Sequence, residues 1–190
     1  HFAALYLKVS VKAVLHYSGT KKEIQQLMSR FEERFAGYFF MATEAYERKE
    51  EIPAAWKTYY SDSNRSKLQY FLLGANAHIN GDIWKTLTHE FSLEELKKFR
   101  KPYYRFNRKL KEELLFIHGT VLDSVSGTRF LHDLSLGLDR HYAKWMFQHW
   151  RKRQLKLSLL WFTDKEKFTV KFNALQRKKA AIDKLILQNL

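Results

Sequence analysis

The chain of 190 residues is 45% hydrophobic and 16% aromatic, a composition that fits a packed globular protein and excludes a disordered one. It contains no cysteine, which excludes disulfide bridges, thiolate metal sites and cysteine nucleophiles. Its net charge of +14 arises in the second half, because residues 1–95 carry 12 Lys/Arg and 12 Asp/Glu whereas residues 96–190 carry 22 and 8.

Helical periodicity dominates the first sixty residues. We predict a helix over residues 2–17, followed by a long helix that Thr20 caps with Glu23 as a capping box. Pro53 ends that second helix and can start a short one through Tyr60. The second helix carries one apolar stripe, made of Leu27, Phe31, Phe35, Tyr38 and Ala42.

The rest of the chain is also helical in pattern. Ser63 or Asn64 can cap a helix that covers residues 68–84. Ser92 should cap the next helix, which Pro102 interrupts. Further helices are predicted over residues 103–122, 129–162 and 163–188, the last capped by Thr163 with Glu166.

These elements predict the fold class. Only 7 Gly and 2 Pro are present and no strand alternation is visible, so we expect an all-α fold, an irregular bundle of six to eight helices. We expect a single helical domain over residues 1–190. No apolar run reaches the roughly 20 residues of a membrane-spanning helix, which indicates a soluble or membrane-peripheral protein.

The segment 76–82 reads Asn-Ala-His-Ile-Asn-Gly-Asp inside an otherwise apolar helical run. Each unpaired polar group buried there would cost about 1–3 kcal/mol. On an α-helix, His78 and Asp82 share one face, and Asn76 and Asn80 share another. Two interpretations follow: all four residues form a structural polar network, or His78 and Asp82 are catalytic.

The same face can also be interpreted as a metal site. His89, eleven positions after His78, returns to nearly the same helical angle, so His78, Asp82 and His89 could bind a divalent metal. Imidazole and carboxylate ligands suit zinc, iron or manganese. Because one helix face rarely surrounds an ion, further ligands are expected from His132, Asp139 or His141.

A family resemblance rests on the same segment. Residues 72–82 resemble the signature helix of a widespread family of bacterial and fungal proteins of unknown function, which reads close to L-x-G-M-N-A-H-I-N-x-D-L. Residues 4–7, 31–38, 52–56 and 131–139 also resemble that family, so the resemblance spans most of the chain. It implies an all-α protein of bacterial type and no established activity.

A looser resemblance concerns the chemistry. The spacing of His78, Asp82 and His89 is similar to the zinc helix of the zinc-dependent phospholipase C and single-strand nuclease family, which is also all-α. This resemblance implies a metal-dependent, hydrolase-like enzyme. That family needs a second His-x-x-x-Asp pair on a later helix, and none exists here, so a mononuclear or dinuclear site is all that we expect.

The basic second half suggests an anionic partner: an acidic protein, an anionic membrane surface or nucleic acid. Cations alternate with aromatic residues there, as in single-strand nucleic-acid binding. The last helix has an apolar stripe that could lie on a membrane or pack on the protein's own core. The candidate anion-binding residues are Lys97, Lys98, Arg100, Lys101, Arg105, Arg108, Arg151, Lys152 and Arg153.

Two hypotheses about function therefore remain. The first is an enzyme in which His78 and Asp82 bind a metal or act as a base and its orienting group. The second is a non-catalytic interaction module, whose basic half docks an acidic partner and whose polar helix only specifies the fold. The environment of His78 distinguishes them.

Overall fold

The computed structural model describes residues 2–62, 64–122 and 138–189. Every regular element in these ranges is a helix, which confirms the expected all-α irregular bundle. Across the same ranges no helix combines the length and apolar character needed to cross a membrane. The expectation of a single domain over residues 1–190 stays a prediction.

The helices follow one another with short connections, apart from the undescribed segment 123–137. In chain order they are α1 (Phe2–Tyr17), α2 (Lys22–Glu47), α3 (Lys57–Tyr60), α4 (Lys67–Ala77), η1 (His78–Asp82), α5 (Ile83–Glu90), α6 (Leu93–Leu122), α8 (Leu138–Thr163) and α9 (Lys165–Asn189). α4, η1 and α5 run without a break as one rod, of which η1 is a π-helical turn.

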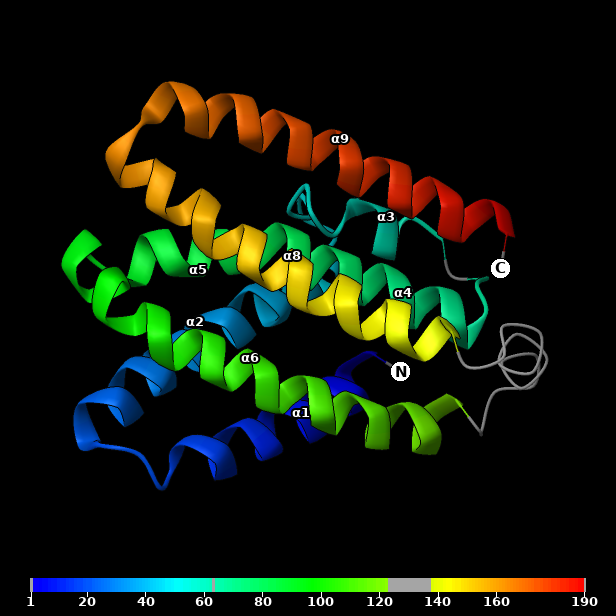
Figure 1. Cartoon of the computed structure of the whole chain (residues 1–190). Helices are drawn as coiled ribbons and strands as arrows, with labels where there is room; N and C mark the ends of the chain where they lie inside the picture. The colour runs from blue at the N-terminus through cyan, green and yellow to red at the C-terminus, as the bar shows by residue number, and fades with distance from the viewer. Residues whose placement is uncertain (1, 63, 123–137, 190) are drawn as a thin grey trace.

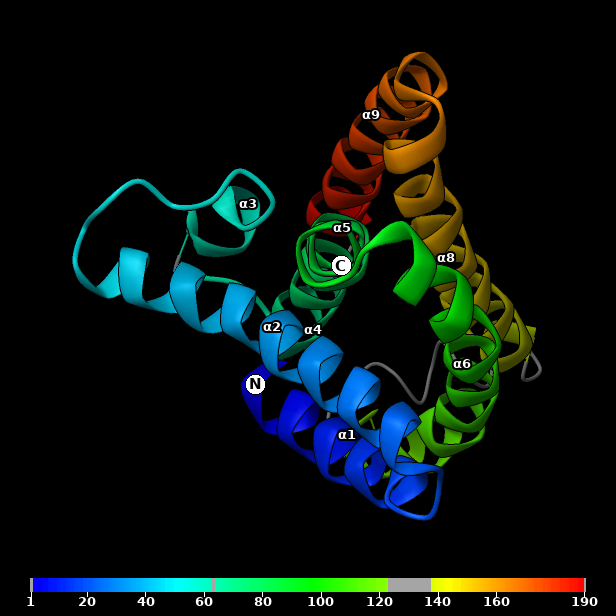
Figure 2. The same ribbon diagram turned by 90° about the vertical axis from the view of Figure 1, so that its left-hand side faces the viewer.

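The rod of α4, η1 and α5 lies in the middle of the bundle. α8 and α9 form an antiparallel pair on one side of it, with α9 packed on α4 and α8 packed on α5 (Figure 1). α6 links the other side of α8 to α1, and α2 packs on α5 and η1 (Figure 2). The π turn is thus covered by helices from both halves of the chain.

Aromatic and aliphatic side chains fill the space around the rod. The predicted stripe of α2 is largely confirmed, with Leu27, Phe31 and Phe35 buried in the main core, whereas Tyr38 is only partly buried. A second cluster surrounds Trp56, and a third joins α5, α8 and α9. Each fully buried side chain of this size contributes about 1.5–3 kcal/mol to stability.

Several predicted helix ends differ from the structure. Thr20 does not cap α2; its hydroxyl instead donates to the carbonyl of Tyr17, and α2 begins after Lys21 without a side-chain cap. Ser66, not Ser63 or Asn64, caps α4, in a capping box with Gln69. The predicted capping box of Ser92 and Glu95 is confirmed.

The predicted break at Pro102 is wrong, because α6 continues through it. Proline removes one backbone hydrogen bond, but Phe99 and Tyr103 on either side are fully buried, and this packing outweighs the loss. At the other end of the bundle, α8 extends to Thr163, whose hydroxyl bonds within α8, and Asp164 accepts from the amide of Lys167 instead. The start of the predicted helix 129–162 lies outside the described residues.

The last helix packs on the protein's own core. Phe168, Leu175 and Ile186 are buried, and α9 contacts both α4 and α8. The apolar stripe of α9 is therefore used within the fold.

Candidate functional site

The π turn η1 carries the polar motif into the centre of the molecule. All five of its residues are buried. A Cβ on Gly81 would lie 2.4 Å from the Cβ of Ala55, so only glycine allows this close approach. π turns are rare inside α-helices and occur frequently at functional sites, because they add one residue to a turn and turn the following side chains to a new direction.

Asp82 holds His78 in a fixed orientation. Its Oδ2 atom lies 3.0 Å from Nδ1 of His78 and accepts a second hydrogen bond, of 2.9 Å, from Nε1 of Trp56. With Asp82 as a carboxylate, Nδ1 of His78 carries the proton and Nε2 is left as an acceptor. We call this arrangement the His78–Asp82 dyad, and it is fully buried, with 3% and 2% of the two residues exposed.

Aromatic rings surround the imidazole of His78. Phe35 stacks on it at 3.5 Å between ring centroids, and Tyr6 meets it edge-on at 4.7 Å. The rings of Phe2 and Trp56 also pack against the imidazole, with centroids 5.7 and 5.9 Å from its centroid. Burial lowers the pKa of His78 and outweighs the raising effect of Asp82, so the imidazole is held neutral, which is the form that can accept a proton.

Nε2 of His78 has no hydrogen-bond partner among the described residues. A buried ring nitrogen without a partner costs about 1–3 kcal/mol, so a histidine that only stabilised the fold would be expected to bond at both nitrogens. The dyad therefore has the geometry of a base with its orienting carboxylate.

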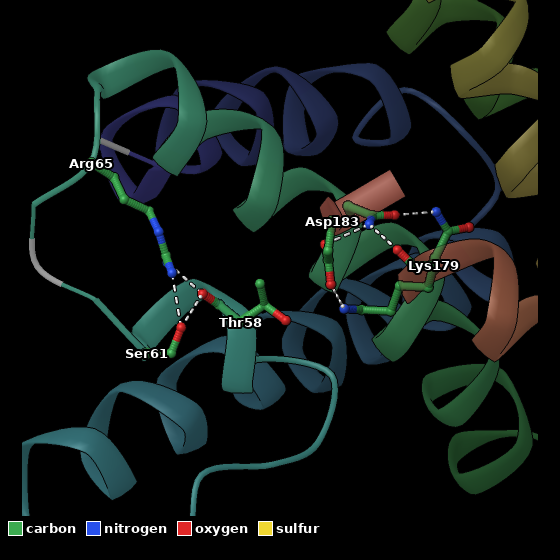
Figure 3. Close-up of polar contacts among 7 residues, drawn as sticks. Thr58, Ser61, Arg65, Lys179 and Asp183 are labelled. Atoms are coloured by element: carbon green, nitrogen blue, oxygen red, sulfur yellow. Dashed lines mark hydrogen bonds and ion pairs between the residues drawn. The ribbon is translucent and has the colours of Figure 1, made fainter. Parts of the chain in front are cut away.

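The asparagines of the motif have a different environment. Asn80 donates to Oδ1 of Asn76 at 2.8 Å, and Gln154 donates to Oδ1 of Asn80 at 3.2 Å. Asn76 in turn donates to Oδ1 of Asp183 at 2.8 Å, and Lys179 pairs with the other oxygen of Asp183 at 2.7 Å (Figure 3). This asparagine network ties η1 to α8 and α9.

A smaller polar contact fixes the chain just before α4. The guanidinium of Arg65 donates to the carbonyl of Thr58 and to the hydroxyl of Ser61, at 2.8 Å for the latter (Figure 3). It thereby anchors the loop between α3 and α4, next to the helix that leads into η1.

Sequence reasoning missed a second polar group near His78. Glu32 of α2, Arg151 of α8 and Tyr6, Ser10 and Asn107 form what we call the Arg151 region. Nε of Arg151 donates to Oδ1 of Asn107 at 2.5 Å, and its guanidinium lies 5.4–5.9 Å from four aromatic ring centroids. Burial raises the pKa of Glu32 to about 7, although Arg151 opposes this shift.

Some of these residues gave a signal in the sequence. A tryptophan in an apolar setting needs an acceptor for its Nε1, and this rule could have pointed to a partner such as Asp82 for Trp56. Glu32 lies four residues after Met28 and three before Phe35, both buried, and a carboxylate is unexpected on that face of α2. Tyr6 gave no such signal. Arg151 was named as a candidate anion-binding residue, but its burial among rings of other helices was not predicted.

The structure does not bring His89 to the dyad. His89 is exposed, and its Nδ1 lies 2.8 Å from the hydroxyl of Tyr38. Eleven helical residues place His89 roughly 16 Å along the axis from His78, too far for one ion to bind both side chains. The extra residue of the π turn also rotates α5 by about 100° from the direction that a continuous α-helix would give.

The other proposed metal ligands lie where the structure describes no side chains. His132 lies outside the described residues, and Asp139 and His141 lie on α8. Within the described part of the chain, no three His, Asp or Glu side chains are grouped so as to hold a metal ion. The dyad alone supplies too few donors for one, so a divalent metal remains a prediction from the sequence.

The predicted anion-binding residues separate into two groups. Arg151 is 3% exposed and belongs to the interior, because its guanidinium packs among rings. Arg153 is half-buried on α8. The exposed members are Lys97, Lys98, Arg100, Lys101, Arg105, Arg108 and Lys152. Lys98 forms a long ion pair of 3.7 Å with Glu23.

Comparison with known proteins places the chain in a family but gives no activity. No curated protein and no solved structure matches it. The model of one family, described as a family of unknown function (DUF5995), matches residues 1–188 and therefore nearly the whole chain. The chain belongs to this DUF5995 family of unknown function.

Proposed function

We propose that this protein is an enzyme of hydrolase type, in which His78 is the base and Asp82 is the residue that positions it. The observation that carries this proposal is the buried dyad, whose Nε2 atom has no partner among the described residues. With Nδ1 directed to Asp82, Nε2 can take a proton from a water molecule or a substrate hydroxyl.

The surroundings of the dyad support a catalytic role. The aromatic rings around His78 lower its pKa by excluding water, which keeps the base unprotonated at neutral pH. Trp56 fixes Asp82, so the carboxylate and the imidazole hold one orientation. Positioned proton transfer of this kind contributes about a hundredfold to ten-thousandfold to a reaction rate.

The proposal is tested with a panel of chromogenic esters, phosphomonoesters and phosphodiesters. We expect hydrolysis of at least one class, lost in His78→Gln and strongly reduced in Asp82→Asn, with both variants still folded by circular dichroism. Tyr38→Phe, which alters a hydroxyl away from Nε2 of His78, is the matched control and should retain activity. Equal activity in His78→Gln, or no hydrolysis of any class, would count against the proposal.

The same panel tests the metal prediction. Activity and melting temperature are measured after adding zinc or manganese, since an ion that binds the folded state must raise its melting temperature. Elemental analysis of the purified protein gives the stoichiometry directly. If the purified protein holds a stoichiometric metal that His78→Gln loses, His78 is a metal ligand. If no metal is found and added ions cause no thermal shift, His78 acts as a base without a metal.

A second candidate function is that of a docking module for an acidic partner. One observation favours it: Lys97, Lys101, Arg105 and Arg108 follow one another at spacings of 4, 4 and 3 on α6, and all four are exposed. They therefore form one basic stripe on the solvent face of α6. We call them the α6 stripe; charge of this kind attracts polyanions in a salt-dependent way.

A further inference from the structure

The Arg151 region lies directly beside the dyad. Phe35 stacks on His78 and also lies 5.9 Å from the guanidinium carbon of Arg151. Tyr6 meets His78 edge-on, and its hydroxyl lies within reach of the charges of both Glu32 and Arg151. The two polar groups therefore share one interior, separated by little more than an aromatic ring.

Two hydroxyl groups in this region are short of partners. Tyr6 and Ser10 lie one turn apart on α1, and their oxygen atoms are buried. Neither finds a partner outside this pair among the described residues. These two oxygens and Nε2 of His78 therefore keep hydrogen-bonding capacity that no described residue outside the Tyr6–Ser10 pair takes up.

The helices α1 and α2 carry the outer residues of this region. Tyr6, Ser10 and Glu32 remain partly exposed, although the polar ends of Tyr6 and Ser10 are covered, whereas His78 and Arg151 lie deeper. The polar groups therefore sit just beneath the surface formed by α1 and α2.

We propose that the Arg151 region binds an oxyanion, a carboxylate or a sulfate-like group, of the molecule on which His78 acts. This inference rests on the proposed function, because it assigns a substrate class to the same site. Arg151 supplies the positive charge, and the hydroxyls of Tyr6 and Ser10 donate to the anionic oxygens. The substrate is thus a small acid whose reacting group lies at Nε2 of His78.

Glu32 should make anion binding at this site depend on pH. An anion beside Arg151 competes with an ionised Glu32, so binding should be accompanied by uptake of one proton at Glu32. Its pKa of about 7 makes that uptake easy near neutral pH. Among the described residues, the titratable and charged groups around Glu32 are Tyr6 and Tyr17 of α1, Tyr103 of α6 and Arg151 of α8. Of these groups, only Glu32 changes charge between about pH 6 and pH 8.

The experiment is titration of the whole protein with sulfate and with acetate, both of which stay fully ionised in this pH range. Binding is followed by calorimetry and by the fluorescence of the tryptophans, one of which bonds to Asp82. If only protein with protonated Glu32 binds the anion, affinity should be about tenfold higher at pH 6 than at pH 8. Glu32→Gln should bind equally well at both pH values.

Controls separate this site from the basic surface. Tyr6→Phe combined with Ser10→Ala should weaken binding at least severalfold, whereas neutralising the α6 stripe should leave it unchanged. Binding that ignores the two hydroxyls, is lost with the α6 stripe, or weakens as the pH falls would overturn the inference. Sulfate binding without hydrolysis would support the anion site and contradict the proposed hydrolase function. Hydrolysis without anion binding would support the proposed function and contradict the anion site.

Discussion

The two polar pairs at the junction of α4 and η1 lie within seven consecutive residues and have opposite environments. The asparagine pair is closed: Asn76 and Asn80 bond to each other and onward to α8 and α9. The dyad is open, because His78 is bonded at Nδ1 and has no partner for Nε2 among the described residues. Burial is the same for both, so burial alone does not separate a structural polar residue from a functional one. What separates them is whether every donor and acceptor is used.

The largest loss of stability should come from a substitution that breaks the hydrogen bonds of the asparagine pair. Asn76→Ala would leave Asn80 and Asp183 each short of a buried hydrogen bond, and we expect a loss of about 3 kcal/mol in unfolding free energy. His78→Ala, at the open site, should cost less, about 1–3 kcal/mol, because Asp82 keeps its bond to Trp56. Urea denaturation of both variants decides the comparison. A larger loss for His78→Ala would mean that the dyad is the more structural of the two.

A smaller loss is expected from Gly81→Ala, which disturbs the turn that presents both pairs. The added methyl would meet the Cβ of Ala55 at 2.4 Å, and such overpacking costs about 1–3 kcal/mol. Ala55→Gly removes the opposing methyl, so the double variant should recover much of the loss. Thermal melting of the two single variants and the double variant tests this. Additive losses would show that the turn depends on something other than this contact.

The buried carboxyl group of Glu32, near the dyad, should make the stability of the protein depend on pH. Burial raises its pKa from 4.5 to about 7, so the folded state holds a proton that the unfolded state releases between these values. Stability should therefore fall as the pH rises from about 4.5 to 7 and stay lowered above it. Because Glu32 is partly exposed, we expect Glu32→Gln to gain only about 1–2 kcal/mol at about pH 8. Denaturation at about pH 4 provides the check, since the gain should vanish there.

The smallest effect on stability is expected at the surface. Replacing the four residues of the α6 stripe by glutamine should change stability by less than about 0.5 kcal/mol. If the stripe docks an acidic partner, the variant should elute from heparin at clearly lower salt. The matched control neutralises four exposed cations of α9, namely Lys171, Arg177, Lys178 and Lys184. Equal shifts for both variants would assign the charge to solubility.

The sequence predicted the fold class and most helices because helical periodicity is a local property. Predictions failed where long-range packing decided the outcome. The helix continues through Pro102 because the residues beside the proline are buried in the core. Arg151 was predicted to bind an anionic partner, but it is buried because rings from α2 and α6 surround its guanidinium. The dyad followed from i,i+4 spacing. The displacement of His89 did not, because no sequence rule signals a π turn at Gly81 before its contact with Ala55 is known.

The π turn also changes what an insertion or deletion means in this protein. It contains one residue more than an α-helical segment of the same length, and this residue is accommodated within the helix rather than in a loop. Deleting a single codon between His78 and Asp82 would let α4 and α5 join as a plain α-helix, and α5 would keep its direction because the lost residue is the one that the π turn accommodates. The bundle would stay intact, whereas the spacing that pairs His78 with Asp82 would change from four residues to three. In alignments of this family, a one-residue gap at this position should therefore be treated as a change of the site.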